Sequence, residues 1–492
     1  MTKNMRCLII NNIKMENCIV NGDFEVPFFN TETETQDIKG LQGSTQTARN
    51  TNELRFEIPM TFHNKEGKTK NEIMSEITQY IDYDEPVTIR IEDEEWHWWG
   101  TVDGSINIKF FKHIYYDFVL NIVLTDPFRY SADYFNNTAA NDQLTVVNSG
   151  TAPAPFTLTA TALKDAAYFA VTDENENHFL IGEDSEEEVI KDYSPSLLTS
   201  ELKSSVGWTR MGANDSIPDR YLGGATGAAL TQNPSGWALN LGSVTQTTGW
   251  RGFGYKRSFN RLAQNFKVKA KIFVRNSFNG SGKIGQFFYD DNNRLIFSIG
   301  YQDAHHTKDS GTIVAMAYNQ AGEEKRLYHA EIPFYIKKMK DIVIYVTIER
   351  QGEAIKVRTW IYNELNDTTR NRPLNIREKT FQDKGKFYQR KIGSVAIGSF
   401  RGNGTYKLMN MLGTFNHELL DIPKGAADMF IKTGDMIVLD TRDDFITVNG
   451  EPYMIKKSFS SSFFKVSTGI SALLISPEET FDTRIRWQDR FK

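Results

Sequence analysis

Five aromatic residues in the middle of the chain form its best candidate for a binding site, with glycine, serine, threonine and asparagine between them: Trp208, Trp237, Trp250, Phe253 and Tyr255. The apolar C–H faces of a sugar ring stack on aromatic planes, while its hydroxyl groups need amide and hydroxyl partners. This mixture of residues therefore suits a carbohydrate-binding cleft. The alternative is that the same aromatic side chains fill the core of a β-sandwich.

Residues that could act as catalysts or metal ligands give weaker signals. Asp290 and Asp291 could form a general acid–base pair, but the stretch "DDNNR" is also typical of a turn, which we favour. His305 and His306 are the best metal candidates, yet adjacent histidines in a strand point to opposite faces and a structural metal needs about four ligands. Phosphate-loop, nucleophile-elbow and zinc-protease motifs do not occur. We therefore predict no catalytic residue, no metal and no cofactor, and do not expect an enzyme.

Composition and charge argue against several other classes of protein. The formal net charge of the 492 residues is −5, so charge gives no support for a nucleic-acid-binding surface. No apolar run reaches about 18 residues and the N-terminus lacks the apolar stretch of a secretion signal, so we expect cytoplasmic synthesis without membrane insertion. Cys7 and Cys18 are expected to be small strand residues, with a hairpin disulfide as the less favoured alternative.

The first 135 residues predict a β-rich domain with a single helix. Apolar residues recur at helical spacing over 69–81, and Thr69 with Glu72 fits a capping box at its start. Strands are predicted on both sides of this helix, at 54–62, 87–93 and 115–124.

The stretch "WHWWG" at 96–100 invites a functional interpretation of His97 among three tryptophans. A strand alternates its faces, so Trp96 and Trp98 share one side. Large flat side chains on one side suit a core or a subunit interface, and we favour that structural role.

A second domain begins near residue 143 and is interrupted. Residues 143–187 predict four strands, too few to cover the faces of a sandwich. Further strands follow in 422–492, where Asn449 and Gly450 supply the positive φ of a tight hairpin. We therefore predict one β-sandwich in two parts, 143–187 and 422–492, because an insertion is tolerated at an exposed loop whose ends lie close together.

The interrupting segment, residues 190–421, has a character of its own. Glycine-rich turns separate many strands, such as 266–274, 341–350 and 355–362, and 285–300 predicts a hairpin. Strands at short, regular intervals predict a two-sheet sandwich of the jelly-roll type.

Several stretches outside the insert resemble the distal tail protein of long, non-contractile-tailed bacteriophages, the siphovirus tail component family. The resemblance covers about 1–185 and 422–492, and its strongest local match is "DPFRY" at Asp126–Tyr130 with "NSGTAPAPFTL" at Asn148–Leu158. Weaker matches are "GDMIVLDTRDDFITVNG" and "FDTRIRWQDRF" near the C-terminus. The resemblance implies an N-terminal domain that forms a hexameric ring and a galectin-like β-sandwich. The insert is similar to carbohydrate-binding jelly-roll modules of enlarged distal tail proteins, since "TGWRGFGYKRSF" at 248–259 resembles a "GW-x-G" followed by a basic residue.

The resemblance also implies a function and partners. It places the chain in the virion tail tip, as a homo-hexameric hub that joins the tail tube to the tail-associated hub protein and a receptor-binding protein. DNA would pass through the ring without specific binding, and the insert would bind host cell-wall polysaccharide. Two alternatives stay open: a purely architectural baseplate protein whose insert contacts neighbouring tail proteins, and a cell-wall hydrolase.

Overall fold

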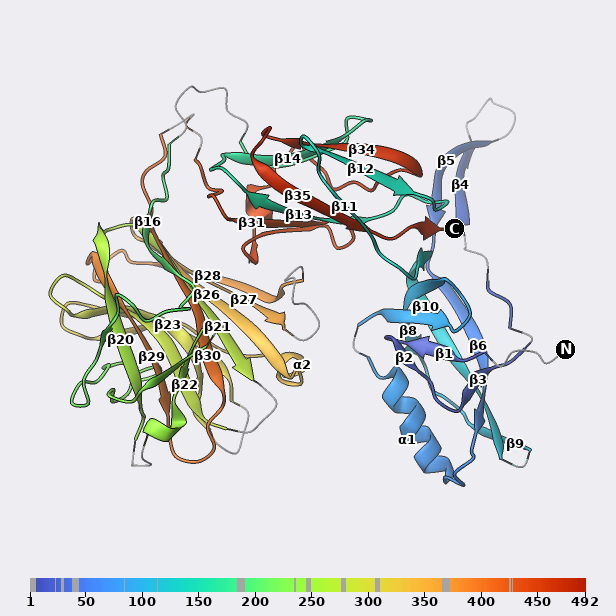
Figure 1. The fold of residues 1–492 in the computed structure, drawn as a ribbon, viewed down its shortest axis with the longest axis horizontal. Helices are drawn as coiled ribbons and strands as arrows, with labels where there is room; N and C mark the ends of the chain where they lie inside the picture. The colour runs from blue at the N-terminus through green and yellow to red at the C-terminus, as the bar shows by residue number, and fades with distance from the viewer. Residues whose placement is uncertain are drawn as a thin grey trace.

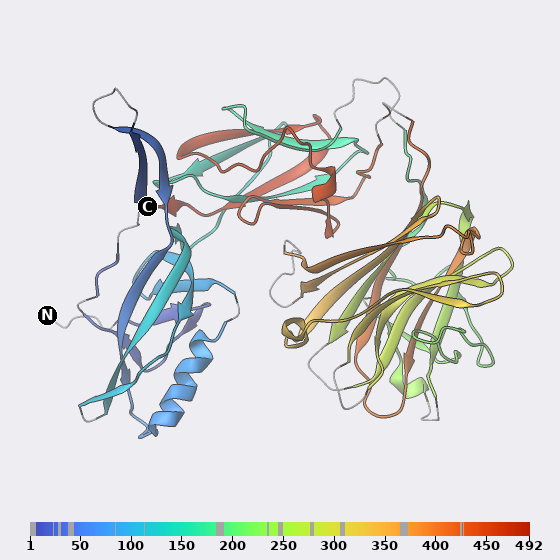
Figure 2. The same cartoon turned by 180° about the vertical axis from the view of Figure 1, so that it is seen from behind.

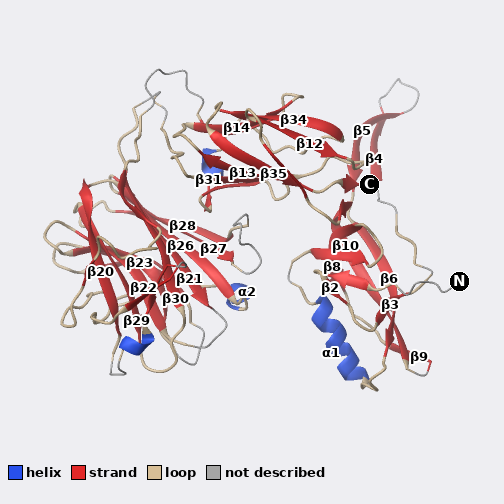
Figure 3. Cartoon of the chain, viewed as in Figure 1, coloured by secondary structure: helices blue, strands red, loops and turns tan. Residues whose placement is uncertain are grey.

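Strands make up most of the protein, and Figures 1 and 3 show them gathered into three lobes. The computed structural model describes residues 6–22, 24–27, 31–37, 44–83, 85–112, 114–183, 191–233, 236–244, 249–275, 280–305, 310–364, 372–423, 426 and 428–492. We call the lobes the N-terminal lobe (6–131), the sandwich (135–182 with 428–487) and the insert (191–423). Seen from either side, the sandwich lies between the other two (Figure 2). The mainly β fold class is confirmed, and no described helix is long and apolar enough to cross a membrane.

The N-terminal lobe is built on one antiparallel sheet with the order β2-β1-β7-β8-β10-β6-β3, and β9 and β36 also pair with β10. Its strands are β1 (Leu8–Ile10), β2 (Ile13–Lys14), β3 (Cys18–Val20), β6 (Leu54–His63), β7 (Val87–Ile91), β8 (Trp96–Asp103), β9 (Lys109–Lys112), β10 (Tyr115–Ser131) and β36 (Arg490–Phe491). A separate hairpin of β4 (Thr31–Asp37) and β5 (Ser44–Thr51) extends beyond it (Figure 1).

The predicted helix is present as α1 (Lys70–Ile81), and it buries Ile73 and Ile77. The capping box is complete, since Glu72 N donates to the Thr69 hydroxyl and Thr69 N donates to the Glu72 carboxylate at 2.7 Å. The two side chains thereby satisfy backbone N–H groups that the first helical turn leaves without partners.

The faces of β8 agree with the structural interpretation of "WHWWG". Trp98 is 1% exposed in the core and Trp96 packs against it edge to face, with ring centroids 4.6 Å apart. His97 and Trp99 point to the opposite side, where the guanidinium of Arg442 lies 4.0 Å from the centroid of the Trp99 ring. Because Arg442 follows β31 (Met436–Asp440) of the sandwich, this side of β8 forms a joint between two lobes.

The burial of His97 at this joint predicts that the stability of the protein depends on pH. Burial, with a smaller effect of the charges on Arg442 and Arg90, lowers the pKa of His97 to about 4. The unfolded chain protonates this histidine near pH 6.5, so the free energy of unfolding falls as pH falls from about 6.5 to 4, by up to about 3 kcal/mol. Urea unfolding at pH 7 and pH 4 should show a smaller difference in His97→Gln than in the wild type, because carboxylate effects are common to both. Equal differences would contradict this role.

The sandwich has two facing sheets, and each contains strands from before and after the insert that pair with one another. The first sheet has the order β11-β35-β13-β31-β32-β33 and the second β12-β34-β14-β15. The strands are β11 (Phe135–Thr138), β12 (Gln143–Asn148), β13 (Phe156–Ala162), β14 (Tyr168–Asp173), β15 (His178–Gly182), β31, β32 (Phe445–Val448), β33 (Glu451–Pro452), β34 (Gly469–Ser476) and β35 (Phe481–Trp487). Thus β13 pairs with β31 on one side and with β35 on the other.

We propose that the three lobes correspond to three folding units, with two differences from the predicted boundaries. β11 lies ahead of residue 143 yet pairs with β35 of the sandwich. β36 lies within 422–492 yet pairs with β10 of the N-terminal lobe.

Three of the stretches that carry the family resemblance meet at Arg490. Its guanidinium pairs with Asp126 at 2.7 Å, lies 3.5 Å from the centroid of the Phe128 ring and donates to Pro153 O at 3.2 Å. Gly150 runs beside it so closely that a Cβ would lie 2.1 Å from Arg490 O. The sequence stretches that resemble the family therefore lie where the N-terminal lobe joins the sandwich.

The insert is a two-sheet sandwich of the predicted kind. The larger sheet has the order β18-β19-β30-β21-β26-β27-β28, with β16 on β30, and the smaller β17-β20-β29-β22-β23-β24-β25. The larger contains β16 (Ser196–Ser200), β18 (Leu230–Asn233), β19 (Gly236–Leu239), β21 (Phe266–Arg275), β26 (Asp341–Gln351), β27 (Ala354–Asn363), β28 (Leu374–Gln382) and β30 (Met409–Glu418). The smaller contains β17 (Thr209–Arg210), β20 (Arg251–Ala263), β22 (Gly282–Tyr289), β23 (Leu295–Asp303), β24 (Thr312–Tyr318), β25 (Glu324–Glu331) and β29 (Ile392–Arg401). The short helices are η1 (Leu241–Ser243) and α2 (Phe334–Lys337) in the insert and η2 (Met454–Lys456) in the sandwich.

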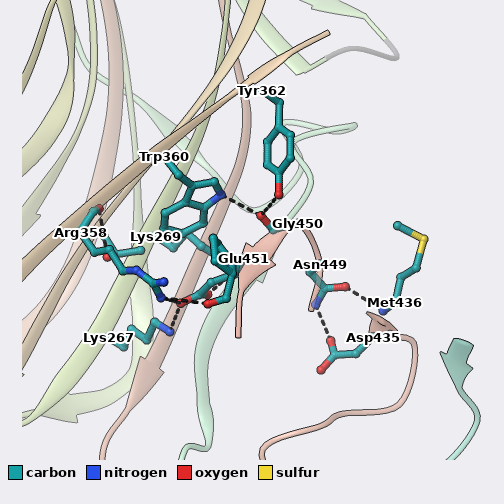
Figure 4. A network of polar contacts seen from close by, with 12 residues as sticks. Lys267, Lys269, Arg358, Trp360, Tyr362, Asp435, Met436, Asn449, Gly450 and Glu451 are labelled. Carbon is teal, nitrogen blue, oxygen red and sulfur yellow. Dashed lines mark hydrogen bonds and ion pairs between the residues drawn. The ribbon is translucent and has the colours of Figure 1, made fainter. Parts of the chain in front are cut away.

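The larger sheet of the insert also contacts the sandwich through the hairpin that ends in β33 (Figure 4). Glu451 forms ion pairs with Lys267 and, at 3.0 Å, with Lys269. Trp360 Nε1 and Tyr362 Oη both donate to Gly450 O, at 2.7 and 2.9 Å. These contacts fix the insert against the sandwich at a second place, in addition to the two chain connections.

Candidate functional site

Four of the five aromatic residues predicted to bind sugar lie together inside the insert. Trp208 contacts Trp237 edge to face at 5.0 Å, Trp237 contacts Tyr255 at 5.5 Å, and Tyr255 contacts Phe253 at 6.0 Å. Trp237 and Phe253 are fully buried, Trp208 is 8% exposed, and Tyr255 is half-buried against the same core. Because these faces are covered by the core, we propose that Trp208, Trp237 and Phe253 have the core role that was the alternative to carbohydrate binding.

The strand β20 explains this placement. Its residues alternate between the core and the outer face of the smaller sheet, and Phe253 and Tyr255 take the core side. Gly254 and Lys256 take the outer side, where a Cβ at Gly254 would lie 2.7 Å from Met211 Sδ. Spacing in the sequence gives this alternation but not which side faces the core.

Trp250, the fifth residue, lies half-buried on the outer face of the smaller sheet. The ammonium of Lys283 lies 4.5 Å from the centroid of its ring, and burial lowers the pKa of Lys283 to about 8. Lys283 Nζ also donates to Arg220 O at 3.1 Å and Gly223 O at 3.3 Å. Trp250 thus helps to hold the segment that covers this sheet.

That covering segment, residues 210–228, is here called the cap segment. Its Ile217 and Leu222 pack into an apolar cluster with Phe287 and Phe400 of the sheet. Asp219, 5% exposed, accepts N–H donors from Tyr221 and Leu222 at 2.8 and 2.7 Å and the hydroxyl of Ser298 from the sheet. The cap segment therefore occupies part of the outer face and leaves one end of the sheet uncovered.

A cavity of about 1130 Å³ opens at that end, between the cap segment, β20 and two hairpin turns of the smaller sheet. Polar and aromatic side chains dominate its lining: Thr209, Arg210, Asp215, Lys256, Arg257, Ser258, Tyr289, Asn293, Arg294, Tyr318, Asn319 and Gln320. None of the five predicted aromatic residues lines it.

Tyr289 and Tyr318 are the aromatic groups of this cavity. The Tyr289 side chain is 5% exposed, and its hydroxyl has no hydrogen-bond partner among the described residues. The ammonium of Lys256 lies 4.0 Å from the centroid of the Tyr289 ring and donates to Asn293 Oδ1. Burial and the nearby Asp219 carboxylate raise the pKa of Tyr318, which keeps its hydroxyl protonated and able to donate. A buried hydroxyl without a partner is costly, so a ligand with hydroxyl or anionic oxygens would be stabilised here.

Sequence reasoning missed both tyrosines, although a signal was available. Each ends a strand immediately before an asparagine-containing turn, in "FFYDDNNR" and "AMAYNQAG". Two hairpins of one sheet that turn at the same edge bring such residues together. Recognising this requires the sheet order, because β22 and β24 are separated by β23.

The other candidates have structural roles. Asp290 accepts the N–H groups of Asn292 and Arg294 at 3.0 and 2.7 Å and pairs with Arg390 at 2.5 Å, so the predicted turn is confirmed. His306 lies outside the described residues, and those that are described contain no cluster of three or more potential metal ligands.

Two family models match the chain, one near each end. The Phage tail protein RIFT-related domain matches residues 19–124, and the Siphovirus-type tail component, C-terminal domain, matches residues 428–491. The matched ranges fall in the N-terminal lobe and in the part of the sandwich that follows the insert, with β36 at its end. No curated protein matches the chain.

Solved structures similar to the chain include two from phage Dit proteins and one glucanase. The Dit protein of phage SPP1 is 14% identical, with a TM-score of 0.30 over 36% of this chain and 74% of its own. The CBM2 module of the evolved Dit of Lactobacillus casei BL23 phage J-1 is 12% identical, with a TM-score of 0.37 over 47% and 99%. A Bacillus licheniformis β-glucanase is 10% identical, with a TM-score of 0.30 over 46% and 99%. None of these likenesses bears on what this chain binds. The chain therefore contains two domains of siphovirus-type tail components, which are proteins of the virion tail tip, and a jelly-roll insert interrupts the sandwich that holds the second of them.

Proposed function

We propose that the chain is the structural hub of the tail tip, assembled as a ring of six copies that contacts the tail tube and the other tail-tip proteins. Two features support a ring. The family consists of tail components, and the N-terminal lobe leaves apolar rings in solvent, with Phe110 and Phe111 64% and 65% exposed. Mass measurement in solution tests this half of the proposal, because six copies of the 56.2 kDa chain are expected and a stable monomer at high concentration would contradict it.

The second half of the proposal is that the insert binds a saccharide of the host cell wall during adsorption. The observation that carries it is the cavity beside Tyr289, whose buried hydroxyl has no partner. At about 1130 Å³ the cavity is at the upper end of ligand sites, large enough for a few sugar units. The amides of Asn293 and Asn319 supply partners for hydroxyl groups, and the exposed guanidinium groups of Arg210 and Arg294 supply further donors.

Binding without hydrolysis is part of the same proposal. Glycosidases that act through paired carboxyl groups hold them about 5 to 10 Å apart on either side of the bond that breaks. Among the described residues that line the cavity, Asp215 is the one carboxylate, and it accepts the N–H of Gly212 at 2.7 Å. A ring of six would turn a weak site, about millimolar alone, into tight attachment through its effective concentration on a polymeric wall.

Blocking the cavity tests the binding proposal. Ala321 lies in an exposed turn on the lining, so Ala321→Trp should fill the cavity without disturbing the core. We expect the full-length variant to sediment with purified walls of the phage's host strain at least tenfold more weakly than the wild type.

The matched control is Gln351→Trp, which adds the same side chain at an exposed position outside the cavity. It should bind as the wild type does. If the wild type fails to bind host walls, or if Ala321→Trp binds them equally well, the cavity is not a wall-binding site.

A further inference from the structure

The cavity beside Tyr289 is rich in positive charge, although the chain as a whole is negative. Among the lining side chains, four are cationic, namely Arg210, Lys256, Arg257 and Arg294. Asp215 is the one carboxylate among the described lining side chains. The formal net charge of the complete chain is −5. The excess of cations is therefore a local property of this site.

These four cations have no carboxylate partner among the described residues. Lys256 donates to the amide oxygen of Asn293, and Arg210 donates to the backbone oxygen of Gly227. The guanidinium of Arg257 runs beside Gly207, where a Cβ would lie 3.4 Å from its Cζ. Neutral partners orient these groups but leave their charge uncompensated.

Two largely buried cations elsewhere in the insert do have carboxylate partners. Lys407 is fully buried and pairs with Asp303 at 2.7 Å, and Arg390 pairs with Asp290 at 2.5 Å. In the cavity, Arg210 and Arg294 are exposed and Lys256 and Arg257 are half-buried, so water stabilises their charge. The cavity therefore keeps cations available to pair with the oxygens of a ligand.

We propose that the cavity recognises an acidic saccharide, with sugar or polyol units that carry phosphate or carboxylate groups. This inference rests on the proposed wall-binding function and names its ligand class. Guanidinium and ammonium groups form charge-assisted hydrogen bonds with such oxygens, and the guanidinium fork matches a phosphate or carboxylate with two parallel bonds. The Tyr289 hydroxyl and the Asn319 amide serve the sugar part of the same ligand.

A nucleic acid fits these observations less well than an acidic saccharide does. Nucleic-acid surfaces present a basic stripe along an extended groove, whereas these cations surround one cavity in an acidic chain. A neutral saccharide would displace water from the cavity and leave several cations without a negative partner.

The test uses the full-length chain and neutralises the cations at the mouth of the cavity. Arg294 is exposed, so Arg294→Gln combined with Arg257→Gln should leave the thermal unfolding temperature unchanged. We expect wall binding to weaken at least tenfold and to depend less on salt. The control Lys379→Gln with Lys386→Gln removes the same charge from exposed positions outside the cavity and should bind as the wild type does.

Chemical treatment of the walls identifies the source of the negative charge. Hydrofluoric acid removes phosphodiester-linked polymers, and carbodiimide activation followed by borohydride reduces carboxyl groups to alcohols. Loss of binding after the first treatment assigns a phosphate-bearing polymer, and loss after the second assigns a uronate-bearing one. Either result supports the inference.

The inference and the proposed function fail in distinguishable ways. If Ala321→Trp abolishes wall binding while the arginine variant and both treated walls bind normally, the ligand is a neutral saccharide and the inference is overturned. If Ala321→Trp binds normally, the proposed function itself fails. Equal affinity for double-stranded DNA and for the wall polymer would also overturn the inference.

Discussion

Replacing Glu451 with alanine is expected to lower the free energy of unfolding of the insert by about 3 kcal/mol and to release the insert from the sandwich. Glu451 is 4% exposed, with Lys267, Lys269 and Arg358 around it (Figure 4). Burial alone would raise its pKa, but the two ammonium groups outweigh burial and lower the pKa to about 2. The Glu451 carboxylate therefore compensates the positive charges at this joint.

The size of the effect follows from what the alanine leaves behind. Without the carboxylate, the two lysine ammonium groups stay beside each other without a counter-charge. Breaking a buried ion pair from one side costs about 3 to 5 kcal/mol. Because the side chains of Lys267 and Lys269 keep 24% and 12% of their exposure, water relieves part of this cost and the lower end applies.

Urea unfolding and small-angle scattering together measure this effect. Glu378→Ala is the control, since Glu378 pairs with Lys356 at 3.9 Å on an exposed part of the same sheet and its loss should cost at most about 1 kcal/mol. Glu451→Ala should also enlarge the radius of gyration. Equal stability losses in the two variants, or an unchanged radius, would show that the insert is held by other contacts.

The ion pairs of Glu451 also predict how the stability of the protein changes with pH. The folded chain keeps Glu451 ionised down to about pH 2, whereas the unfolded chain protonates it near pH 4.5. Its stabilising contribution is therefore complete above about pH 4.5 and is lost as pH falls towards 2. The wild type and Glu451→Ala should differ progressively less in stability over that range.

The sequence predicted well those features that short stretches encode. The helix α1 followed from apolar spacing and from Thr69 with Glu72, and both were found. The turn at Asn449 and Gly450 followed from their tolerance of positive φ, and the structure places them at φ 50° and 73°. Local propensity and local hydrogen bonding decide such elements, so a window of a few residues contains the information.

The candidate site was predicted poorly because its residues meet only through tertiary structure. Aromatic type alone does not say which side of a strand faces the core, and Trp237 and Phe253, which were predicted to bind sugar, are fully buried. Tyr289 and Lys256 meet because β20 and β22 lie on the two sides of β29. That arrangement has no signature in the sequence of either strand.

The glycine of the "GW-x-G" stretch illustrates the same point, and it leads to the second large prediction. Gly252 lies in β20 opposite Phe400 of β29. A Cβ at this position would lie 1.7 Å from Ser399 O and 2.8 Å from the Cα of Phe400. These are backbone atoms of the paired strand, so neither can turn away as a flexible side chain would. The glycine is therefore required for strand pairing, whether or not the insert binds a sugar.

Gly252→Ala should accordingly lower the free energy of unfolding of the insert by about 3 kcal/mol or more, because the two strands must separate locally and lose ladder hydrogen bonds. Gly249→Ala is the matched control: Gly249 has φ 94° but nothing within 4 Å of its would-be Cβ, so the cost is backbone strain of about 1 kcal/mol. Calorimetry should show the insert of Gly252→Ala melting at a lower temperature while the transition of the other lobes is kept. If the two variants lose equal stability, close packing is not what requires glycine at position 252, and a direct role of this stretch in ligand binding becomes the better explanation.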